Sequence, residues 1–122
     1  YGVLDDAGPL RNNRLALVTL GSPLGDGDIR ALLGASPDSI RVPPGVERWE
    51  NVYDRGDMFA SPLAAAVRGV NDVELSTRGA DAVEAHYVDR YLRDQATGEA
   101  LLRALCTVGG FDTRSCAAKK PT

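Results

Sequence analysis

Four side chains of this 122-residue sequence have the chemistry of a nucleophilic catalytic site. Ser22 ends the apolar run in "LVTLGSPLG". Asp54 and Asp57 lie in "RWENVYDRGDMFASPL", and His86, the only histidine, lies in "AHYVDRYL". In such a site, histidine takes the proton of a serine nucleophile, while a carboxylate fixes the imidazole tautomer and stabilises its cation. Aspartates followed further along the chain by a histidine therefore predict acyl-transfer chemistry.

Ser22 is a poor candidate for the nucleophile itself. The motif G-x-S-x-G has serine in the third place, whereas "GSPLG" has it in the second. Pro23 also removes the backbone N–H that would follow the nucleophile in the oxyanion hole. We expect Ser22 to end a strand near the site. A Ser22 nucleophile in an unusual arrangement remains an alternative.

The apolar pattern predicts the strands that must position these side chains. "LALVTL" (15–20) is apolar at nearly every position, as in a parallel strand covered on both faces. "ERWENVYD" (47–54) is typical of a second strand, and "VNDVELS" (70–76) alternates apolar and acidic residues like an edge strand. Asp57 and His86 then fall at or beyond strand ends, where open parallel sheets carry their functional groups.

Two helical patterns follow the third predicted strand. In "VEAHYVDRYL" (83–92), helical spacing puts four side chains near one face: Val83, Tyr87, Val88 and Tyr91. In "QATGEALLRAL" (95–105), Asp94 offers a cap and an apolar stripe consists of Leu101, Leu102 and Leu105. Strands that alternate with helices predict an α/β fold, here a partial parallel sheet of about three strands with flanking helices.

From Leu17 to about Leu105, the chain resembles the C-terminal half of a bacterial α/β-hydrolase family of lipase- or esterase-like serine hydrolases. Three stretches carry the resemblance, and they occur in the family's order: "LVTLGSPLG", "VPPGVERWENVYDRGD" and "AHYVDRYLRDQATGEAL". The resemblance implies the C-terminal portion of an α/β-hydrolase fold. It implies His86 as the catalytic base and Asp57 as the triad acid, with Asp54 as the main competitor for that role.

The resemblance also implies that the nucleophile precedes the strand at 15–20. "YGVL" at the start is similar to the helix that follows the nucleophile, so the serine would lie several residues before Tyr1. Residues 1–106 would then be the C-terminal part of a hydrolase domain whose nucleophile half is missing, and 107–122 a flexible tail. The strand at 15–20 would expose an apolar sheet edge that a missing N-terminal half or a partner chain must cover.

The function that follows is a serine hydrolase acting on ester or related acyl bonds of a small-molecule or lipid-like substrate. No metal and no organic cofactor is implied. The 122 residues alone are expected to be inactive, because the nucleophile and the oxyanion hole lie elsewhere. The alternative is a non-catalytic binding or interaction domain that kept the hydrolase scaffold and lost the chemistry.

Composition narrows the choice of partner and location. The net charge of −3 gives no sign of a nucleic-acid or anionic-membrane partner. No stretch approaches the ~20 apolar residues that span a bilayer, and the cytoplasm is the default location. Cys106 and Cys116 do not make up the four ligands of a structural zinc site. A bridge between them is an alternative, but free thiols are the expectation.

Overall fold

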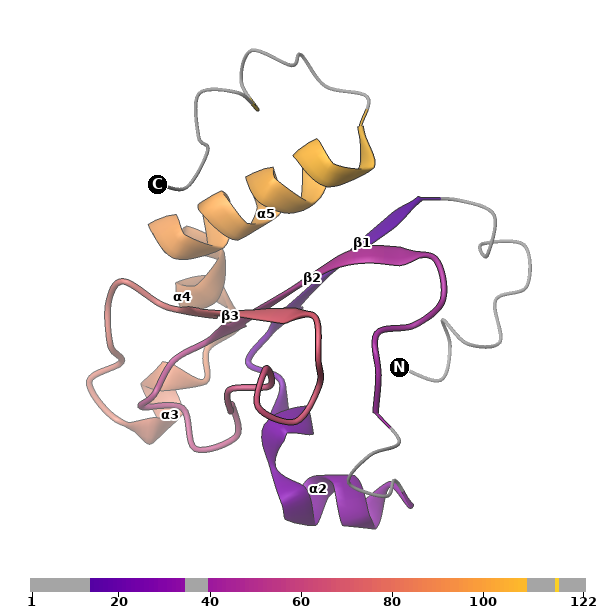
Figure 1. The fold of residues 1–122 in the computed structure, drawn as a ribbon. Coiled ribbons are helices and arrows are strands. Elements are labelled where there is room, and N and C mark those ends of the chain that lie inside the picture. Colours follow the sequence, from indigo (N-terminus) through magenta and orange to yellow (C-terminus); the bar gives the residue numbers. More distant parts are fainter. Residues whose placement is uncertain (1–13, 35–39, 110–115, 117–122) are drawn as a thin grey trace.

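A parallel sheet of three strands forms the centre of the described structure. The computed structural model describes residues 14–34, 40–109 and 116. Strands β1 (Leu15–Leu20), β2 (Val46–Tyr53) and β3 (Val70–Glu74) lie side by side in that order, and both pairings are parallel (Figure 1). With helices on its flanks, this sheet confirms the predicted α/β arrangement and the three predicted strands.

The register of the sheet joins polar side chains of all three strands. Asn51 of β2 lies opposite Thr19 of β1 and Asp72 of β3. Its side chain accepts a hydrogen bond from the Thr19 hydroxyl at 2.8 Å and donates one to Asp72 Oδ1 at 2.8 Å. Asn51 is fully buried, so these bonds satisfy polar atoms that would otherwise be costly inside the protein.

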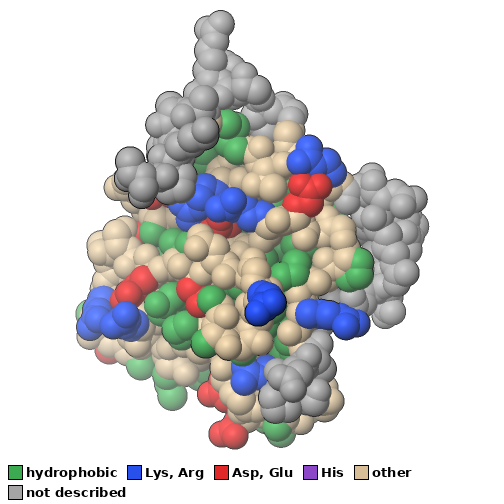
Figure 2. All heavy atoms as spheres, in the orientation of Figure 1, with side chains coloured by type: hydrophobic (Ala, Val, Ile, Leu, Met, Phe, Trp, Pro, Cys, Tyr) green, Lys and Arg blue, Asp and Glu red, His purple; other side chains and the backbone are tan. Residues whose placement is uncertain are grey.

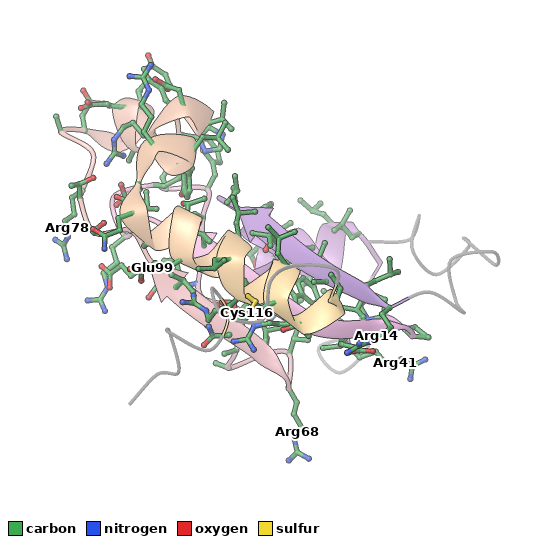
Figure 3. All side chains as sticks on the ribbon, turned by 90° about the horizontal axis from the view of Figure 1, so that it is seen from above. Arg14, Arg41, Arg68, Arg78, Glu99 and Cys116 are labelled. Atoms are coloured by element: carbon green, nitrogen blue, oxygen red, sulfur yellow. A yellow bond between two sulfur atoms is a disulfide. The ribbon has the colours of Figure 1, made fainter. Side chains whose placement is uncertain are left out.

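Different kinds of structure cover the two faces of the sheet. On one face lie α5 (Gln95–Val108) and α4 (Val88–Arg93) (Figures 1 and 3). There Tyr91 and Ala100 pack with Val52 of β2. On the other face, Ile40 and Leu63 lie in irregular segments of the chain. They form one hydrophobic cluster with four further buried residues: Val46, Trp49, Val67 and Val70. The short helix α2 (Gly27–Leu32) lies below the sheet in Figure 1.

Helix α5 meets the sheet with small side chains rather than with leucines. Asp94 caps it as predicted, since its carboxylate accepts a hydrogen bond from the Ala96 N–H at 2.9 Å. The predicted apolar stripe lies largely outside the core, because Leu101 and Leu105 are each 42% exposed and Leu102 is half-buried. The buried residues are instead Thr97, Ala100 and Ala104. Small residues let the helix backbone come close to the strands.

The predicted helix at 83–92 is broken into two short helices. Helix α3 (Ala82–Ala85) ends at His86, and α4 begins after Tyr87, whose backbone is extended. The prediction of one apolar face is therefore wrong: Val83, Tyr87 and Val88 are exposed, and only Tyr91 is buried. The break turns α4 so that Tyr91 enters the core, while His86 is left at the end of α3.

A buried carboxylate ties α5 to the central strand. Glu50 of β2 is fully buried and accepts hydrogen bonds from the Arg103 guanidinium of α5, both at 3.1 Å, and from Asn71 Nδ2 at 2.6 Å. Arg48 donates a further one. Burial alone would raise the pKa of Glu50, but these bonds outweigh it and hold the pKa below its usual value. Glu50 is therefore a paired charge within the core.

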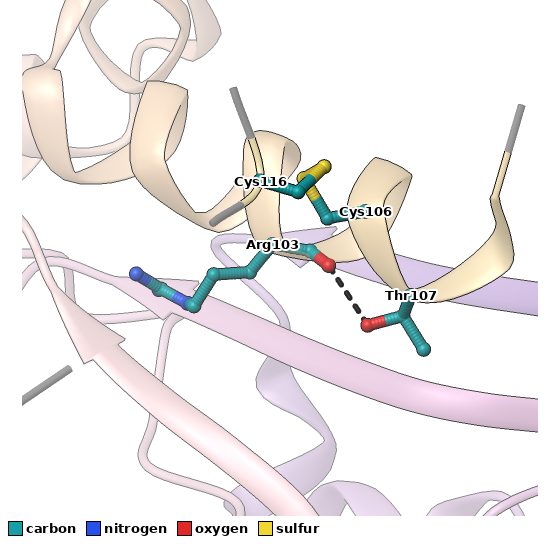
Figure 4. The surroundings of a disulfide bond; sticks show 4 residues. All are labelled: Arg103, Cys106, Thr107 and Cys116. Carbon is teal, nitrogen blue, oxygen red and sulfur yellow. Dashed lines mark hydrogen bonds between the residues drawn. A yellow bond between two sulfur atoms is a disulfide. The ribbon is translucent and has the colours of Figure 1, made fainter. Parts of the chain in front are cut away.

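A disulfide joins Cys106 of α5 to Cys116, so the expectation of free thiols is wrong (Figure 4). Helix α5 continues past Cys106 to Val108, and Cys116 lies beside it with a Cα–Cα distance of 5.6 Å. That distance lies within the range of disulfide geometry. The division into 1–106 and 107–122 stays a prediction, because 110–115 and 117–122 lie outside the described residues. Residues 1–13, which include the "YGVL" segment, lie outside them as well.

The described surface shows mixed charge. On the face drawn in Figure 2, basic side chains stand in several separate groups, some of them next to acidic side chains. The exposed ion pairs Arg14–Glu47 and Arg55–Glu74 measure 2.8 and 3.1 Å, and exposed pairs of this kind contribute little to stability. Among the described residues, no helix combines the length and apolar character that crossing a membrane requires.

Candidate active site

The structure brings together the predicted acid and the predicted base. Asp57 lies in the loop that follows β2, and His86 lies at the end of α3, after β3. Because β2 and β3 are parallel, both loops leave the sheet at its carboxyl edge. His86 Nδ1 lies 3.1 Å from Asp57 Oδ1 and 3.0 Å from Oδ2. A contact between residues 29 positions apart is thus set by strand topology.

The Asp57 carboxylate is buried and receives hydrogen bonds on both oxygens. Its side chain has no exposed area, whereas 49% of the His86 side chain is exposed. The Phe59 backbone N–H donates to Oδ1 at 2.9 Å, and the Tyr91 hydroxyl donates to Oδ2 at 2.8 Å. Because both of these partners are donors, the carboxylate oxygens act as acceptors and can accept a further hydrogen bond from the imidazole.

This arrangement decides the tautomer of His86. A carboxylate can only accept, so Nδ1 carries the proton and Nε2 of the neutral ring is left as the basic nitrogen. No described residue forms a hydrogen bond with Nε2. The Phe59 ring lies beside the imidazole, with a centroid distance of 4.8 Å and an interplanar angle of 58°. His86 is therefore held on its Nδ1 side and has an available base on the other.

Asp54, the competing acid, has a different role. Its carboxylate pairs with Arg90 at 2.8 Å and accepts the backbone N–H groups of Gly56 at 2.8 Å and Gly79 at 2.9 Å. Burial acts to raise the pKa of Asp54, but the Arg90 and backbone hydrogen bonds outweigh it and hold the pKa below its usual value. Asp54 thus ties the loop that carries Asp57 to the segment that leads into α3, the helix that ends beside His86.

Ser22 caps a turn and does not join the pair. Its Oγ accepts a hydrogen bond from the Leu24 N–H at 3.3 Å, at the start of the 3-10 turn Pro23–Gly25. Within the described part of the chain, no hydrogen bond links Ser22 to His86. This placement agrees with the prediction that Ser22 ends a strand near the site.

Two residues that contact Asp57 were missed by sequence reasoning. Tyr91 was expected on an apolar helix face, and its hydroxyl instead reaches Asp57. Gly21 has φ +61°, and a Cβ added there would lie 3.3 Å from both Asp57 Oδ2 and the Tyr91 hydroxyl. The sequence signal for Gly21 is its place in "GSPLG", but that motif makes Ser22, not Gly21, the candidate for a functional role. Nothing in the residue types alone indicates that a buried tyrosine serves an aspartate.

Exposed apolar side chains neighbour Asp57 and His86 in the chain, and the described residues offer no ligand set for a metal. Met58, Phe59, Val83 and Tyr87 flank Asp57 and His86 in the chain, and each is more than half exposed. Among the described residues, no group of three or more His, Cys, Asp or Glu could hold a metal ion. What the arrangement can do is move a proton through His86 with Asp57 as its orienting acid.

Comparison of the chain with protein-family models, curated proteins and solved structures finds no match.

Proposed function

We propose that this chain carries the acid and the base of a serine hydrolase acting on ester or related acyl bonds, within the C-terminal portion of an α/β-hydrolase-like domain. The observation that carries the proposal is the bond from His86 Nδ1 to the buried Asp57 carboxylate at the carboxyl edge of a parallel sheet. The order of the two residues along the chain agrees with this class of triad.

The environments of the two residues favour a catalytic pair over a purely structural one. Half of the His86 side chain is exposed, while the Asp57 side chain is fully enclosed. Burial on the acid side strengthens the interaction with the imidazole, and exposure on the base side gives access to a substrate. Asp54 and Arg90 hold the underlying loops without occupying the base.

In the proposed reaction, His86 Nε2 takes the proton of a serine hydroxyl while the serine oxygen forms a bond to the acyl carbon. The carbonyl π electrons move to the oxygen, and the resulting imidazolium is stabilised by Asp57. Collapse of this intermediate breaks the bond to the leaving oxygen, which receives the proton from Nε2. Water then repeats the sequence, with His86 as base and afterwards as acid, and releases the carboxylic acid.

The nucleophile and the oxyanion hole are proposed to lie outside these 122 residues. The edge of β1 that faces away from β2 is the natural place for the strand that leads to them, because no described strand pairs with that edge. A longer chain or a partner chain could supply that strand. Residues 1–122 would then be inactive by themselves, since removal of a triad member costs orders of magnitude.

The exposed apolar side chains that neighbour Asp57 and His86 in the chain favour a substrate with an apolar acyl group. Met58 is 72% exposed, Phe59 53%, Val83 65% and Tyr87 53%. Large apolar side chains that stand exposed beside a candidate base often mark a ligand surface. A small-molecule ester with an aliphatic chain, or a lipid-like ester, matches this surface better than a charged substrate does.

The disulfide bears on the location of the protein. Structural disulfides persist in oxidising compartments and are rare in the cytosol, where thiols are kept reduced. We therefore favour an oxidising compartment over the cytoplasmic default, on the basis of the Cys106–Cys116 bridge.

The proposed function is tested with the protein as its gene encodes it. Hydrolysis of p-nitrophenyl butyrate is measured for the wild type, His86→Ala, Asp57→Asn and the matched surface control Asp89→Asn. We expect kcat to fall roughly a thousandfold or more in the first two variants and to stay unchanged in the control. Hydrolysis that survives in His86→Ala, or is absent from the wild type, would contradict the proposal and point to a binding domain.

A further inference from the structure

The Tyr91 hydroxyl joins the two aspartates that follow β2. It donates to Asp57 Oδ2 at 2.8 Å and accepts the backbone N–H of Asp54 at 3.1 Å. Tyr91 itself is 1% exposed and packs in the core with Val52 and Ala100. A phenol oxygen can donate one hydrogen bond and accept others, so the Asp54 N–H directs the single phenol proton towards Asp57.

This bond completes the set of donors around the carboxylate. The Phe59 N–H binds Oδ1, the Tyr91 hydroxyl binds Oδ2, and His86 Nδ1 faces both oxygens. With one oxygen fixed by backbone and the other by a core side chain, the carboxylate plane cannot rotate freely. The orientation that receives the imidazole proton is thus set by Tyr91 together with the loop.

We infer that Tyr91 is a positioning residue, whose hydroxyl holds the Asp57 carboxylate in the orientation that receives the His86 Nδ1 proton. The catalytic consequence of this inference rests on the proposed function, whereas the positioning itself does not. Three elements meet at this point: the loop after β2, helix α4, and the end of β1, which contributes Gly21.

Two further observations support the role. Burial, followed by the hydrogen bond to Asp57, raises the pKa of Tyr91 well above its usual value, so the hydroxyl stays protonated and remains a donor. Gly21 lies against the pair, and a Cβ at that position would be 3.3 Å from both Asp57 Oδ2 and the Tyr91 hydroxyl. The end of β1 therefore leaves room for this hydrogen bond and for little else.

The test removes only the hydroxyl, in Tyr91→Phe, and compares it with Tyr53→Phe, which removes the hydroxyl of a second buried tyrosine. The protein as its gene encodes it is labelled with ¹⁵N-histidine, and the His86 ring signal is identified by its loss in His86→Ala. The first readout is the exchange rate of the Nδ1 proton with water. The second is the separation of kcat from KM with p-nitrophenyl butyrate.

We expect the Nδ1 proton to exchange at least about tenfold faster in Tyr91→Phe, and kcat to fall about tenfold or more with KM within about twofold. Tyr53→Phe should change neither readout. Both variants are also made in a Gly98→Ala background, which stabilises the exposed side of α5 and keeps them folded. An exchange rate equal to that of the wild type overturns the positioning role. A wild type without esterase activity overturns the proposed function alone, because proton exchange needs no turnover.

Discussion

His86 Nδ1 lies 3.0 Å from Asp57 Oδ2, although 29 residues separate them in the chain. The contact crosses from the loop after β2 to the end of α3, and it depends on parallel neighbouring strands that release both loops at one edge of the sheet. Hydrogen bonds of Asp54 with the Gly79 N–H and of Tyr91 with the Asp54 N–H hold those loops together. Each of these dependencies can be tested separately.

Asp54→Asn should weaken folding and leave the chemistry largely intact. The change removes the charge that pairs with Arg90 and one acceptor among those that bind Gly56 and Gly79. We expect a loss of about 2 kcal/mol in the free energy of unfolding, typical of hydrogen bonds to a charged group. Urea unfolding measures the loss, and kcat should stay within about tenfold of wild type. A loss of kcat as large as that of Asp57→Asn would show that Asp54 is the catalytic acid.

Gly21→Ala and Gly98→Ala should act in opposite directions. Gly21 has φ +61°, and an added Cβ would lie 3.3 Å from Asp57 Oδ2 and from the Tyr91 hydroxyl, so alanine there costs about 1–2 kcal/mol of backbone strain and also disturbs Asp57. Gly98 lies in α5 with nothing near its added Cβ, and alanine there should stabilise by about 1 kcal/mol. Thermal unfolding measures both effects: the midpoint should fall in Gly21→Ala and rise in Gly98→Ala. Equal shifts for the two variants would contradict the account of Gly21.

Asp94 should make the stability of the fold depend on acid pH. Burial raises its pKa, but hydrogen bonds from Ser76, Ala96 and Thr77 outweigh this effect and lower the pKa to about 2. A folded pKa below the unfolded one means that the stabilisation is complete at neutral pH and is lost as pH falls from about 4 to about 2.

Asp94→Asn should therefore lose on the order of 2 kcal/mol at pH 7. The difference from the wild type should shrink as pH approaches 2. Urea unfolding at a series of pH values checks this result, with the surface variant Asp89→Asn as the control. A difference that is constant with pH would show that the carboxylate charge of Asp94 does not contribute.

Reduction of the Cys106–Cys116 bridge should destabilise the fold without affecting the site. The two cysteines are 10 residues apart in sequence, and a loop of that order is worth about 2–3 kcal/mol. Cys106→Ser with Cys116→Ser should lower the unfolding midpoint, and dithiothreitol should lower it in the wild type only. Alkylation and mass spectrometry of protein taken from its native host then show whether the bridge forms there. Two free thiols in that sample would return the location to the cytoplasmic default.

The strands and the proximity of Asp57 to His86 could be predicted because both depend on local patterns and residue order. Continuous apolar character marks β1, and the spacing of Asp57 and His86 after successive strands places them at one edge. Parallel pairing of β2 and β3 then makes the loops that follow these two strands neighbours. Which of Asp54 and Asp57 contacts His86 could not be decided from the sequence alone, because both residues lie close together in the loop after β2.

What could not be predicted depends on partners that are distant in sequence. The periodicity of 83–92 suits one helix, yet the contacts of His86 and Tyr91 with the loop after β2 accompany a break between them. A leucine stripe in α5 suggests the wrong face, because close packing on the sheet selects alanines such as Ala100 and Ala104. The disulfide depends on where residue 116 returns to α5, which the spacing of two cysteines does not determine.

The proposed role of His86 as the base is tested most directly by active-site labelling of the protein as its gene encodes it. A fluorophosphonate probe is allowed to react, and the modified peptide is identified by mass spectrometry in the wild type and in His86→Ala. We expect one labelled serine, in a G-x-S-x-G sequence outside these 122 residues. Labelling should be about a hundredfold slower in His86→Ala. No labelled serine, a label on Ser22, or a labelling rate that does not depend on His86 would contradict it.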